Sequence, residues 1–229
     1  MGTKERQERD REAVRRAILD AARDLFVNEG YQNVSLRKIA ERIEYSPAAI
    51  YGYFSGKDDI FIALAEEGFR LLCNPERPET FEALRTLPPL DRLRATFWRF
   101  YEFSQQHPQY FLLMFVDRSV PRICREYERF RFAREAKSLL LTEIQACIKE
   151  HLLPDTVEPH VVVRLMTMGL LGVAMMRLSD RLGATENADL LAEDILNVIL
   201  AGLRSGTAIK STGIGAEGID ETDEALHAS

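Results

Sequence analysis

The residues of this chain that could hold a phosphate backbone are concentrated between positions 34 and 61. The candidates are two of the serines, two of the tyrosines and one of the lysines in this segment: Ser35, Ser46, Tyr51, Tyr53 and Lys57. Hydroxyl groups donate hydrogen bonds to phosphate oxygens, and a lysine ammonium neutralises their charge. Tyrosines and a lysine in such a segment point to DNA binding rather than to the making or breaking of bonds.

Two short helices are expected to position these side chains. Ser35 precedes an apolar set with the i, i+3, i+4, i+7 spacing of one helix face: Leu36, Ile39, Ala40 and Ile43. Ser46 can cap a second helix that starts at Pro47, where a missing N–H costs nothing. The few residues between the helices force a steep crossing, as in a helix-turn-helix whose second helix enters the major groove of DNA.

The segment SLRKIAERIEYSPAAIYGYFSGKDDIF resembles the DNA-binding segment of the tetracycline-repressor (TetR) family of regulators. The serine-capped short helix, Ile50-Tyr51, Tyr53-Phe54 and Lys57 in fixed register carry this likeness. The resemblance implies phosphate contacts at the five positions named above, and buried positions at Ile50 and Phe54. It also implies that the first helix meets the DNA backbone near Arg15 and Arg16.

Two features differ from the family pattern. Glu44 stands where family turns commonly carry glycine, at a site that could need a left-handed backbone, which costs a non-glycine residue roughly 1 kcal/mol. The recognition helix offers DNA few groups that could bond to base edges: Pro47, Ala48, Ala49, Gly52 and Tyr53. Arg37 and the arginines of the N-terminal arm are therefore better candidates for reading bases or a narrow minor groove.

The phosphate-binding candidates also have a structural interpretation. The serines could be plain helix caps, and the tyrosines could form the edge of an amphipathic core. Lys57 could be a solvated lysine, although a cation beside the positive end of the next helix is unfavourable by ~0.3 to 1 kcal/mol unless an anion accompanies it.

Charge is unevenly distributed along the chain. The 229 residues carry a net charge of −6, but residues 1–57 hold 11 Lys and Arg against 9 Asp and Glu, a net charge of +2, and the remainder carries −8. The N-terminal part is therefore the positive one, as a DNA-binding module requires. A hydrophobic content of 46% in this length predicts one large core and a smaller satellite unit.

Catalysis, metal binding and secretion are disfavoured. Cys73, Cys124 and Cys147 are odd in number and share no close spacing, which predicts neither disulfides nor a zinc site and fits a reducing cytoplasm. Scattered histidines without a partnered nucleophile, and the lack of a glycine-rich phosphate loop, predict that the chain is not an enzyme and has no cofactor. A charged N-terminus predicts no secretory signal.

The chain is expected to be all-α, with four successive parts. These are a charged N-terminal arm at 1–10, a three-helix helix-turn-helix DNA-binding domain at 11–57, a larger helical ligand-binding and dimerisation domain at 58–205, and a disordered tail at 206–229. The first helix is expected at Arg11–Asn28, and a proline-rich seam at Asn74–Pro89. Val161–Leu178 contains two arginines and is better interpreted as a buried helix than as a membrane span.

The helix expected at about residues 160–181 has apolar residues on two faces, which one neighbour cannot cover. The resemblance implies that the last two long helices pair with their copies in a four-helix bundle, and a palindromic operator requires a two-fold dimer. The expected interface residues are Leu165, Gly169, Gly172, Met176, Leu191, Ile195, Val198 and Gly202. The alternative is that both faces belong to the core of one subunit.

The resemblance also implies a cavity for a small hydrophobic ligand in the large domain. The expected lining is Phe97, Trp98, Tyr101, Phe111, Met114, Met166 and Leu170, which could equally be ordinary core. The expected function is a repressor that such a ligand releases from double-stranded operator DNA. The alternative is a DNA-binding architectural or adaptor protein that senses nothing, which a solid body would favour.

Overall fold

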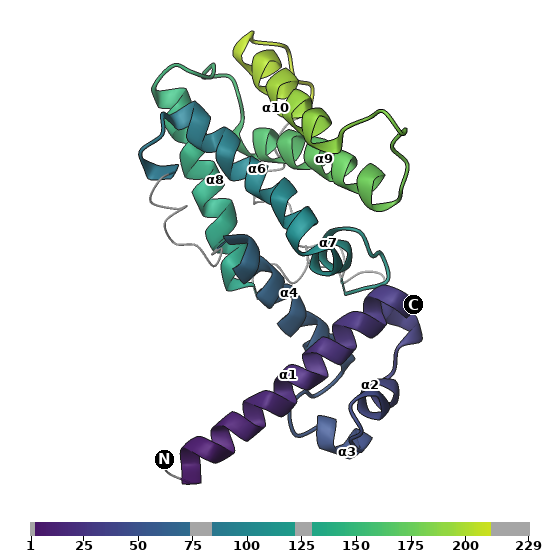
Figure 1. Ribbon diagram of the computed structural model, residues 1–229. Coiled ribbons are helices and arrows are strands. Elements are labelled where there is room, and N and C mark those ends of the chain that lie inside the picture. The colour runs from purple at the N-terminus through teal and green to yellow at the C-terminus, as the bar shows by residue number, and fades with distance from the viewer. Residues whose placement is uncertain (1–2, 74–83, 122–129, 212–229) are drawn as a thin grey trace, which may run out of the picture.

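The computed structural model describes residues 3–73, 84–121 and 130–211, and all regular elements in these ranges are helical. In chain order they are α1 Thr3–Glu29, the 3-10 turn η1 Tyr31–Asn33, α2 Leu36–Arg42, α3 Pro47–Ile50, α4 Lys57–Cys73, α6 Pro89–Gln106, α7 Pro108–Phe115, α8 Arg131–Lys149, α9 Pro159–Leu178 and α10 Ala188–Arg204 (Figure 1). The predicted all-α fold is confirmed.

Local chemistry sets the ends of most helices. The helices α6, α7 and α9 each carry proline in the first turn. A backbone N–H at this position has no acceptor within the helix, so its loss breaks no hydrogen bond. Asn187 caps α10, because its side-chain oxygen accepts hydrogen bonds from the backbone N–H groups of Asp189 and Leu190. These signals are local in the sequence, and the helix expected at about residues 160–181 is observed at Pro159–Leu178.

The first helix begins earlier than the sequence predicts. Its first residue is Thr3 rather than Arg11, so the described part of the expected arm, residues 3–10, continues the helix. Glu5 precedes Arg9 by four residues, which is the spacing and order that stabilise a solvated helix. In Figure 1 this end of α1 projects beyond α2 and α3.

A small hydrophobic core holds α1, α2 and α3 against the start of α4. Its buried residues include Ile18, Phe26, Ile39, Ile50 and Phe61. The ring of Tyr31, in the turn after α1, lies 5.0 Å from the ring of Phe26 and 5.8 Å from that of Phe61. Aromatic pairs at these separations stabilise a core beyond the area that they bury. The start of α4 is therefore part of the same unit as α1, α2 and α3, which we call the DNA-binding unit after the function that the sequence predicts.

The rest of α4 runs into the larger helical body, where α8 packs against α4 and α6, and α9 packs against α10 (Figure 1). An ion pair joins α6 to α8, with Arg92 Nε 2.6 Å from Oε2 of the buried Glu143. The rings of Phe100, Phe111 and Phe115 join α6 to α7, with centroids 5.1 to 5.4 Å apart.

Among the described helices, α9 is the one long and apolar enough to cross a membrane. It packs against α6, α8 and α10, and its residues Met166 and Leu170 are fully buried there. A single helix of this kind is weak evidence for a membrane span, because the core helix of a folded domain has the same composition. The packing agrees with the buried-helix interpretation.

Several expected features fall partly outside the described residues. After α10, residues 206–211 are exposed and non-helical, and the rest of the expected tail, 212–229, lies outside the described ranges. Residues 74–83 of the proline-rich seam and Cys124 lie outside them too.

Candidate DNA-binding module and ligand cavity

Serine caps begin both helices of the helix-turn-helix. Ser35 Oγ accepts a hydrogen bond from the backbone N–H of Lys38 at 3.2 Å, and Ser46 Oγ accepts one from that of Ala49 at 3.2 Å. Pro47 follows in the first turn of α3. The predicted helix starts are confirmed. A capping hydroxyl retains a proton that it can donate to a phosphate, so the caps are compatible with the predicted phosphate contacts. Those contacts stay a prediction.

The turn between α2 and α3 is closed by a left-handed residue. Glu44 has a φ of 60°, and its backbone N–H donates to the carbonyl of Glu41 at 3.3 Å. The N–H of Tyr45 donates to the carbonyl of Ala40 at 2.9 Å, which completes the pair of bonds of a Schellman helix end. Glu44 thus adopts the left-handed conformation that the sequence analysis suggested for this position.

Replacing Glu44 by glycine is expected to raise the free energy of unfolding by up to about 1 kcal/mol, because glycine adopts a positive φ without steric cost. Chemical denaturation measures the change. The matched control is Glu41→Gly inside α2, which should lose roughly 0.5 to 1 kcal/mol. A Glu44→Gly variant as unstable as the control would show that the glutamate is not strained.

The segment from Ser46 to Tyr53 presents a continuous exposed surface. Its exposed residues are Ser46, Pro47, Ala48, Tyr51 and Gly52, with Ala49 and Tyr53 half-buried. Tyr51 is 61% exposed, although large aromatic side chains are usually covered. Beneath this surface Ile50 and Phe54 are buried, as the family resemblance implied. We call residues 46–49 and 51–53 the recognition surface.

Two arginines of α1 lie beside the recognition surface. The guanidinium carbon of Arg15 is 5.5 Å from the centre of the Phe54 ring, and that of Arg11 is 5.8 Å from the centre of the Tyr53 ring. Arg15 was expected near DNA from the sequence, whereas Arg11 was not. Its spacing of one helical turn from Arg15 is the signal that would have found it.

Two other predicted DNA contacts have partners within the chain. Lys57 Nζ donates to the backbone carbonyl of Tyr31 at 2.8 Å and lies 4.2 Å from the centre of its ring. Arg37, whose side chain is 79% exposed, pairs with Glu41 at 2.7 Å. A contact with DNA would require each side chain to leave or share its present partner. The roles of Lys57 and Arg37 therefore stay predictions.

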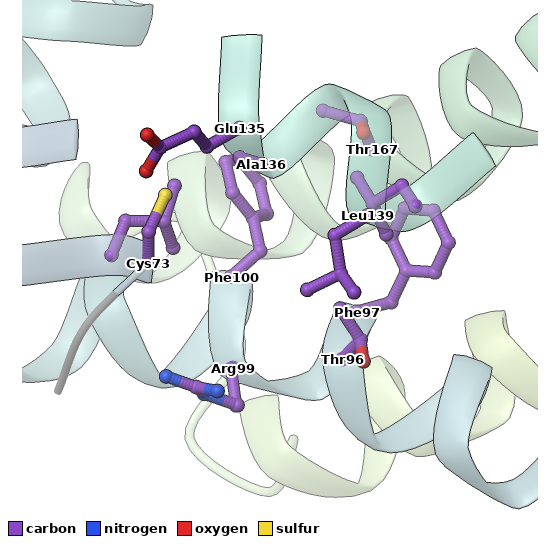
Figure 2. Close-up of a pocket in the computed structure, with 11 residues that line it drawn as sticks. Cys73, Thr96, Phe97, Arg99, Phe100, Glu135, Ala136, Leu139 and Thr167 are labelled. Atoms are coloured by element: carbon purple, nitrogen blue, oxygen red, sulfur yellow. The ribbon is translucent and has the colours of Figure 1, made fainter. Parts of the chain in front are cut away.

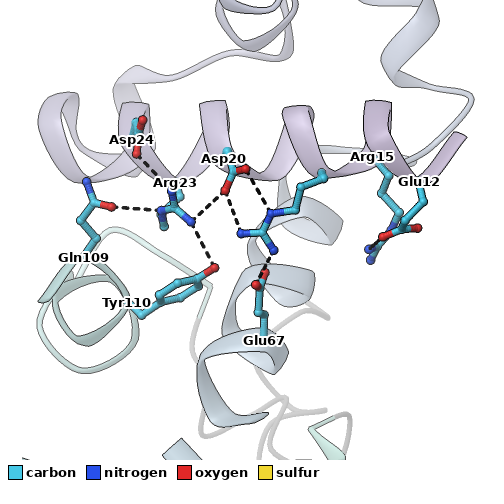
Figure 3. Close-up of polar contacts among 9 residues, drawn as sticks. Glu12, Arg15, Asp20, Arg23, Asp24, Glu67, Gln109 and Tyr110 are labelled. Carbon is cyan, nitrogen blue, oxygen red and sulfur yellow. Dashed lines mark hydrogen bonds and ion pairs between the residues drawn. The ribbon is translucent and has the colours of Figure 1, made fainter. Parts of the chain in front are cut away.

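Arg16, which the resemblance implies lies near the DNA backbone, has ionic partners within the chain. It pairs with Glu67 of α4, and its Nη2 lies 2.8 Å from Oδ1 of Asp20 (Figure 3). Burial opposes ionisation of Asp20, but Arg16 and then Arg23 outweigh it and lower the pKa of this carboxyl. Arg16 thus ties α1 to α4 within the chain.

The helix α7 contacts both α1 and α4. Arg23 of α1 donates to Gln109 Oε1 at 3.0 Å and to the hydroxyl of Tyr110 at 3.2 Å (Figure 3). On α4, a Cβ added to Gly68 would lie 2.2 Å from Sδ of Met114, so glycine permits the close packing of α4 on α7. The first and last helices of the DNA-binding unit are therefore both held by one helix of the body.

A cavity of about 230 Å³ lies between α4, α6, α8 and α9 (Figure 2). Its lining is mostly apolar: Leu72, Cys73, Thr96, Phe97, Arg99, Phe100, Glu135, Ala136, Leu139, Leu140 and Thr167. A concave apolar site with a few polar groups is the usual form of a small-molecule site.

Of the seven ligand-binding residues expected from the sequence, Phe97 lines this cavity and the other six do not. Tyr101, Phe111, Met166 and Leu170 are fully buried among core side chains. Met114 packs on Gly68, and Trp98 Nε1 donates to Glu102 at 3.2 Å. The residues that the sequence analysis missed include Arg99. The sequence signal that would have identified Arg99 is a cation between Phe97 and Phe100 on a helix whose apolar face packs in the core.

Some of the expected dimer residues pack within the subunit, and others are exposed on its surface. A Cβ on Gly169 would lie 2.5 Å from Cγ2 of Ile195, so both residues take part in the packing of α9 on α10 within one subunit. Both are half-buried, and their place in a dimer interface stays a prediction. Leu165, Leu191 and Gly202 are half-buried. A Cβ on Gly172 would meet no described atom within 4 Å.

Exposed apolar residues remain on the outer sides of these two helices. They are Met168, Gly172 and Met176 on α9, and Leu190 and Val198 on α10. Met168 is 60% exposed and Val198 is 69% exposed. We call these five residues the α9–α10 face. Exposed apolar residues gathered on two neighbouring helices are typical of a protein interface.

Comparison with known proteins places the small unit in a family. Residues 18–64 match the model of the bacterial regulatory proteins, tetR family. The chain is 40% identical over 53 residues to the HTH-type transcriptional repressor AcnR of Corynebacterium diphtheriae, across 23% of this chain and 28% of that protein. It is 31% identical over 106 residues to the HTH-type transcriptional activator FasR of Mycolicibacterium smegmatis, across 46% and 47%. The chain thus spans less than half the length of these relatives.

The fold as a whole is similar to that of FadR from Bacillus subtilis, solved in complex with stearoyl-CoA. The TM-score is 0.66 at 15% identity, across 81% of this chain and 97% of that one. At this identity the likeness concerns the fold. Together, the match over residues 18–64 and the capped helix-turn-helix show that this segment is similar to the DNA-binding segment of the bacterial regulatory proteins of the tetR family.

Proposed function

We propose that this protein is a transcriptional repressor that binds double-stranded operator DNA and is released from it by a small hydrophobic ligand. The observation that carries the proposal is the exposed recognition surface, which is preceded by a serine cap and flanked by Arg11 and Arg15. AcnR, which is more identical to this chain than FasR is, is named a repressor, which favours repression. FasR is named an activator, and expression of a reporter gene placed behind the operator distinguishes repression from activation.

The binding unit in this proposal is a homodimer in the cytoplasm. A two-fold dimer places two recognition surfaces on the two halves of a palindromic operator. The α9–α10 face supplies an apolar surface for such a pairing. The dimer would form through the last two long helices of each subunit.

The cavity favours a ligand-responsive regulator over the non-sensing adaptor. A ligand in this cavity would touch α4, which also forms part of the core of the DNA-binding unit. It could then favour a conformer whose recognition surfaces are wrongly spaced for the operator. By linkage, the ligand would weaken DNA binding by the factor by which DNA weakens ligand binding, commonly ~5 to 150-fold.

The first test of the proposal is Tyr51→Ala, which should weaken operator binding by about tenfold, the loss of one hydrogen bond to a charged phosphate. Because Tyr51 is exposed, the thermal midpoint should not change. Gel-shift titration on an operator selected from genomic fragments measures the affinity. Tyr51→Phe is the matched control, because it keeps the ring and removes the hydroxyl alone. Unchanged binding by both variants would remove Tyr51 from the interface.

Lys57→Ala separates the DNA role of this lysine from its structural one. A lost phosphate contact should reduce the slope of log affinity against log salt by roughly one unit. The lost hydrogen bond to Tyr31 should lower the free energy of unfolding by about 1 kcal/mol. Lys149→Ala, in the last turn of α8, is the control for a general change of charge. A fall in stability with an unchanged salt slope would leave Lys57 a structural residue.

A further inference from the structure

The cavity between α4, α6, α8 and α9 carries its charged side chains on one side. Figure 2 shows Arg99 and Glu135 there, whereas Phe97 and Thr167 lie on the other side. Phe97 and Phe100 are almost fully buried, so the apolar part of the lining belongs to the core of the body. A molecule in this space would therefore bury most of its surface against carbon atoms.

The charges of this lining are balanced within the chain. Its acidic side chain, Glu135, accepts a charge-assisted hydrogen bond at Oε1 from Nε of Arg131 at 2.7 Å. Burial lowers the pKa of the basic side chain, Arg99, and the carboxylate of Glu102, one turn further along α6, is among the groups that oppose this shift. A charged ligand would therefore lose its hydration without gaining an uncompensated counter-charge, which is unfavourable.

Two uncharged polar groups of the lining are also hydrogen-bonded within the chain. The thiol of Cys73 donates to the backbone carbonyl of Phe132 at 3.3 Å, and burial raises its pKa to about 12, so the thiol is uncharged at neutral pH. The hydroxyl of Thr96 donates to the backbone carbonyl of Arg92 at 2.9 Å. Each group would have to give up its present bond in order to donate to a ligand.

Thr167 differs from Thr96 in this respect. It is half-buried on α9 and lines the cavity, and its hydroxyl makes no hydrogen bond to the part of the chain that the structure describes. A hydroxyl beside apolar walls is costly to leave unpaired, and it can donate its proton to any acceptor that reaches it. The apolar side of the cavity therefore has one hydroxyl that is available to a ligand.

We propose that this cavity takes an uncharged, mainly apolar molecule, and that the hydroxyl of Thr167 donates a hydrogen bond to an acceptor on it. This inference rests on the proposed function only in naming the cavity as the effector site, and it adds the charge, the polar group and the size of the ligand. An engineered cavity of about 150 Å³ in another protein holds benzene, so the volume of about 230 Å³ accommodates roughly nine nonhydrogen atoms. A longer molecule would extend past Leu139, which is 37% exposed.

The test uses four probes of the same shape and the same number of nonhydrogen atoms on the full chain: acetophenone, cumene, benzoate and 1-phenylethylammonium. Isothermal titration calorimetry measures their affinities. Acetophenone, which is uncharged and carries an acceptor, should bind at least about tenfold more tightly than either ion. Benzoate or the ammonium probe binding as tightly as acetophenone would overturn the proposal, as would no binding of acetophenone up to its solubility.

Variants assign the hydrogen bond to its residue. Thr167→Val keeps the shape of the side chain and removes the hydroxyl. It should weaken acetophenone by about three- to tenfold, the loss of one hydrogen bond between uncharged groups, and leave cumene, which has no acceptor, within about twofold. Thr167→Ser should keep most of the affinity for acetophenone.

Thr96→Val is the matched control, because Thr96 lines the same cavity with a hydroxyl that is already bonded to Arg92. It should change the affinities for acetophenone and cumene by the same factor. An unchanged affinity of Thr167→Val for acetophenone, or an equal loss in Thr96→Val, would overturn the assignment to Thr167.

A filling substitution keeps the proposal testable if Thr167→Val does not fold. Ala136 lines the cavity from α8 and is half-buried, so Ala136→Leu puts a larger side chain into the space. It should weaken acetophenone and cumene alike by about tenfold or more, because both need the same volume. Unchanged affinities for both probes would place their site outside this cavity and contradict the proposal.

Operator binding, measured by fluorescence anisotropy in the same samples, separates this inference from the proposed function. Acetophenone that binds through Thr167 but leaves the operator bound supports the ligand class and contradicts release by this cavity. A protein released by benzoate but not by acetophenone supports ligand-induced release and contradicts the ligand class. Release by acetophenone that is weakened in Thr167→Val and retained in Thr96→Val supports both.

Discussion

Replacing Gly172 by leucine will convert the proposed dimer to monomers at concentrations where the unchanged protein is dimeric. A Cβ at this position meets no described atom of its own subunit within 4 Å, so the added side chain points into open space. On the α9–α10 face it would lie between two copies of the chain. Overpacking costs ~1 to 3 kcal/mol per site, and a two-fold axis counts it twice, so dimerisation should lose roughly 2 to 6 kcal/mol.

Sedimentation velocity measures the loss of dimerisation. The thermal midpoints of Gly172→Leu and Gly169→Leu show whether either substitution also changes the stability of the subunit. Gly172→Leu should leave the subunit's stability unchanged or slightly raised, because leucine is the better helix former. Gly169→Leu should lower it, since a Cβ there would lie 2.5 Å from the Ile195 side chain. If Gly172→Leu dimerises as tightly as the unchanged protein, the interface lies on another surface.

Phe61→Ala is expected to lower the free energy of unfolding by ~3 to 5 kcal/mol, which for a chain of this size lowers Tm by roughly 6 to 20 °C. Phe61 is 1% exposed and its ring packs on Tyr31, whose hydroxyl donates to Asp58 of α4. Truncation therefore leaves a cavity in the core that joins the start of α4 to the rest of the DNA-binding unit. Operator binding should fall as well, because this core supports the recognition surface.

Differential scanning calorimetry checks the loss of stability. Phe61→Leu, which refills most of the volume, should cost less than the alanine variant. Tyr51 is exposed on the recognition surface, so the Tyr51→Ala variant should show the opposite pattern, with weaker DNA binding and an unchanged thermal midpoint. A Phe61→Ala midpoint within a few degrees of the unchanged protein would mean that the surrounding helices collapse into the space.

The parts of the DNA-binding unit that follow from short stretches of sequence could be predicted. Ser35 and Ser46 cap helices through bonds to residues only three positions away, and Glu44 adopts its positive φ within a single turn. The start of α1 could not be located in this way. Its first turns have no apolar periodicity, and charged pairs such as Glu5 and Arg9 support a helix without leaving a hydrophobic pattern.

Features that depend on which helices meet could not be predicted. The apolar faces of α9 follow from periodicity, but periodicity does not say whether Gly169 meets its own subunit's α10 or a second copy. The cavity lining comes from four helices, so only Phe97 of the expected set lies on it. Lys57 shows a further limit, since a cation suited to phosphate is equally suited to the carbonyl of Tyr31.

The unbroken length of α1 has a geometric consequence for any change in the body. Its 27 residues form a rod about 40 Å long, and its contact with Tyr110 is at Arg23, about 30 Å from residue 3. A tilt of about 5° around that contact would move the far end by about 3 Å, close to the rise of one base pair along a DNA strand, about 3.4 Å. A displacement too small to disturb the packing at α7 would thus be large on the scale of the operator.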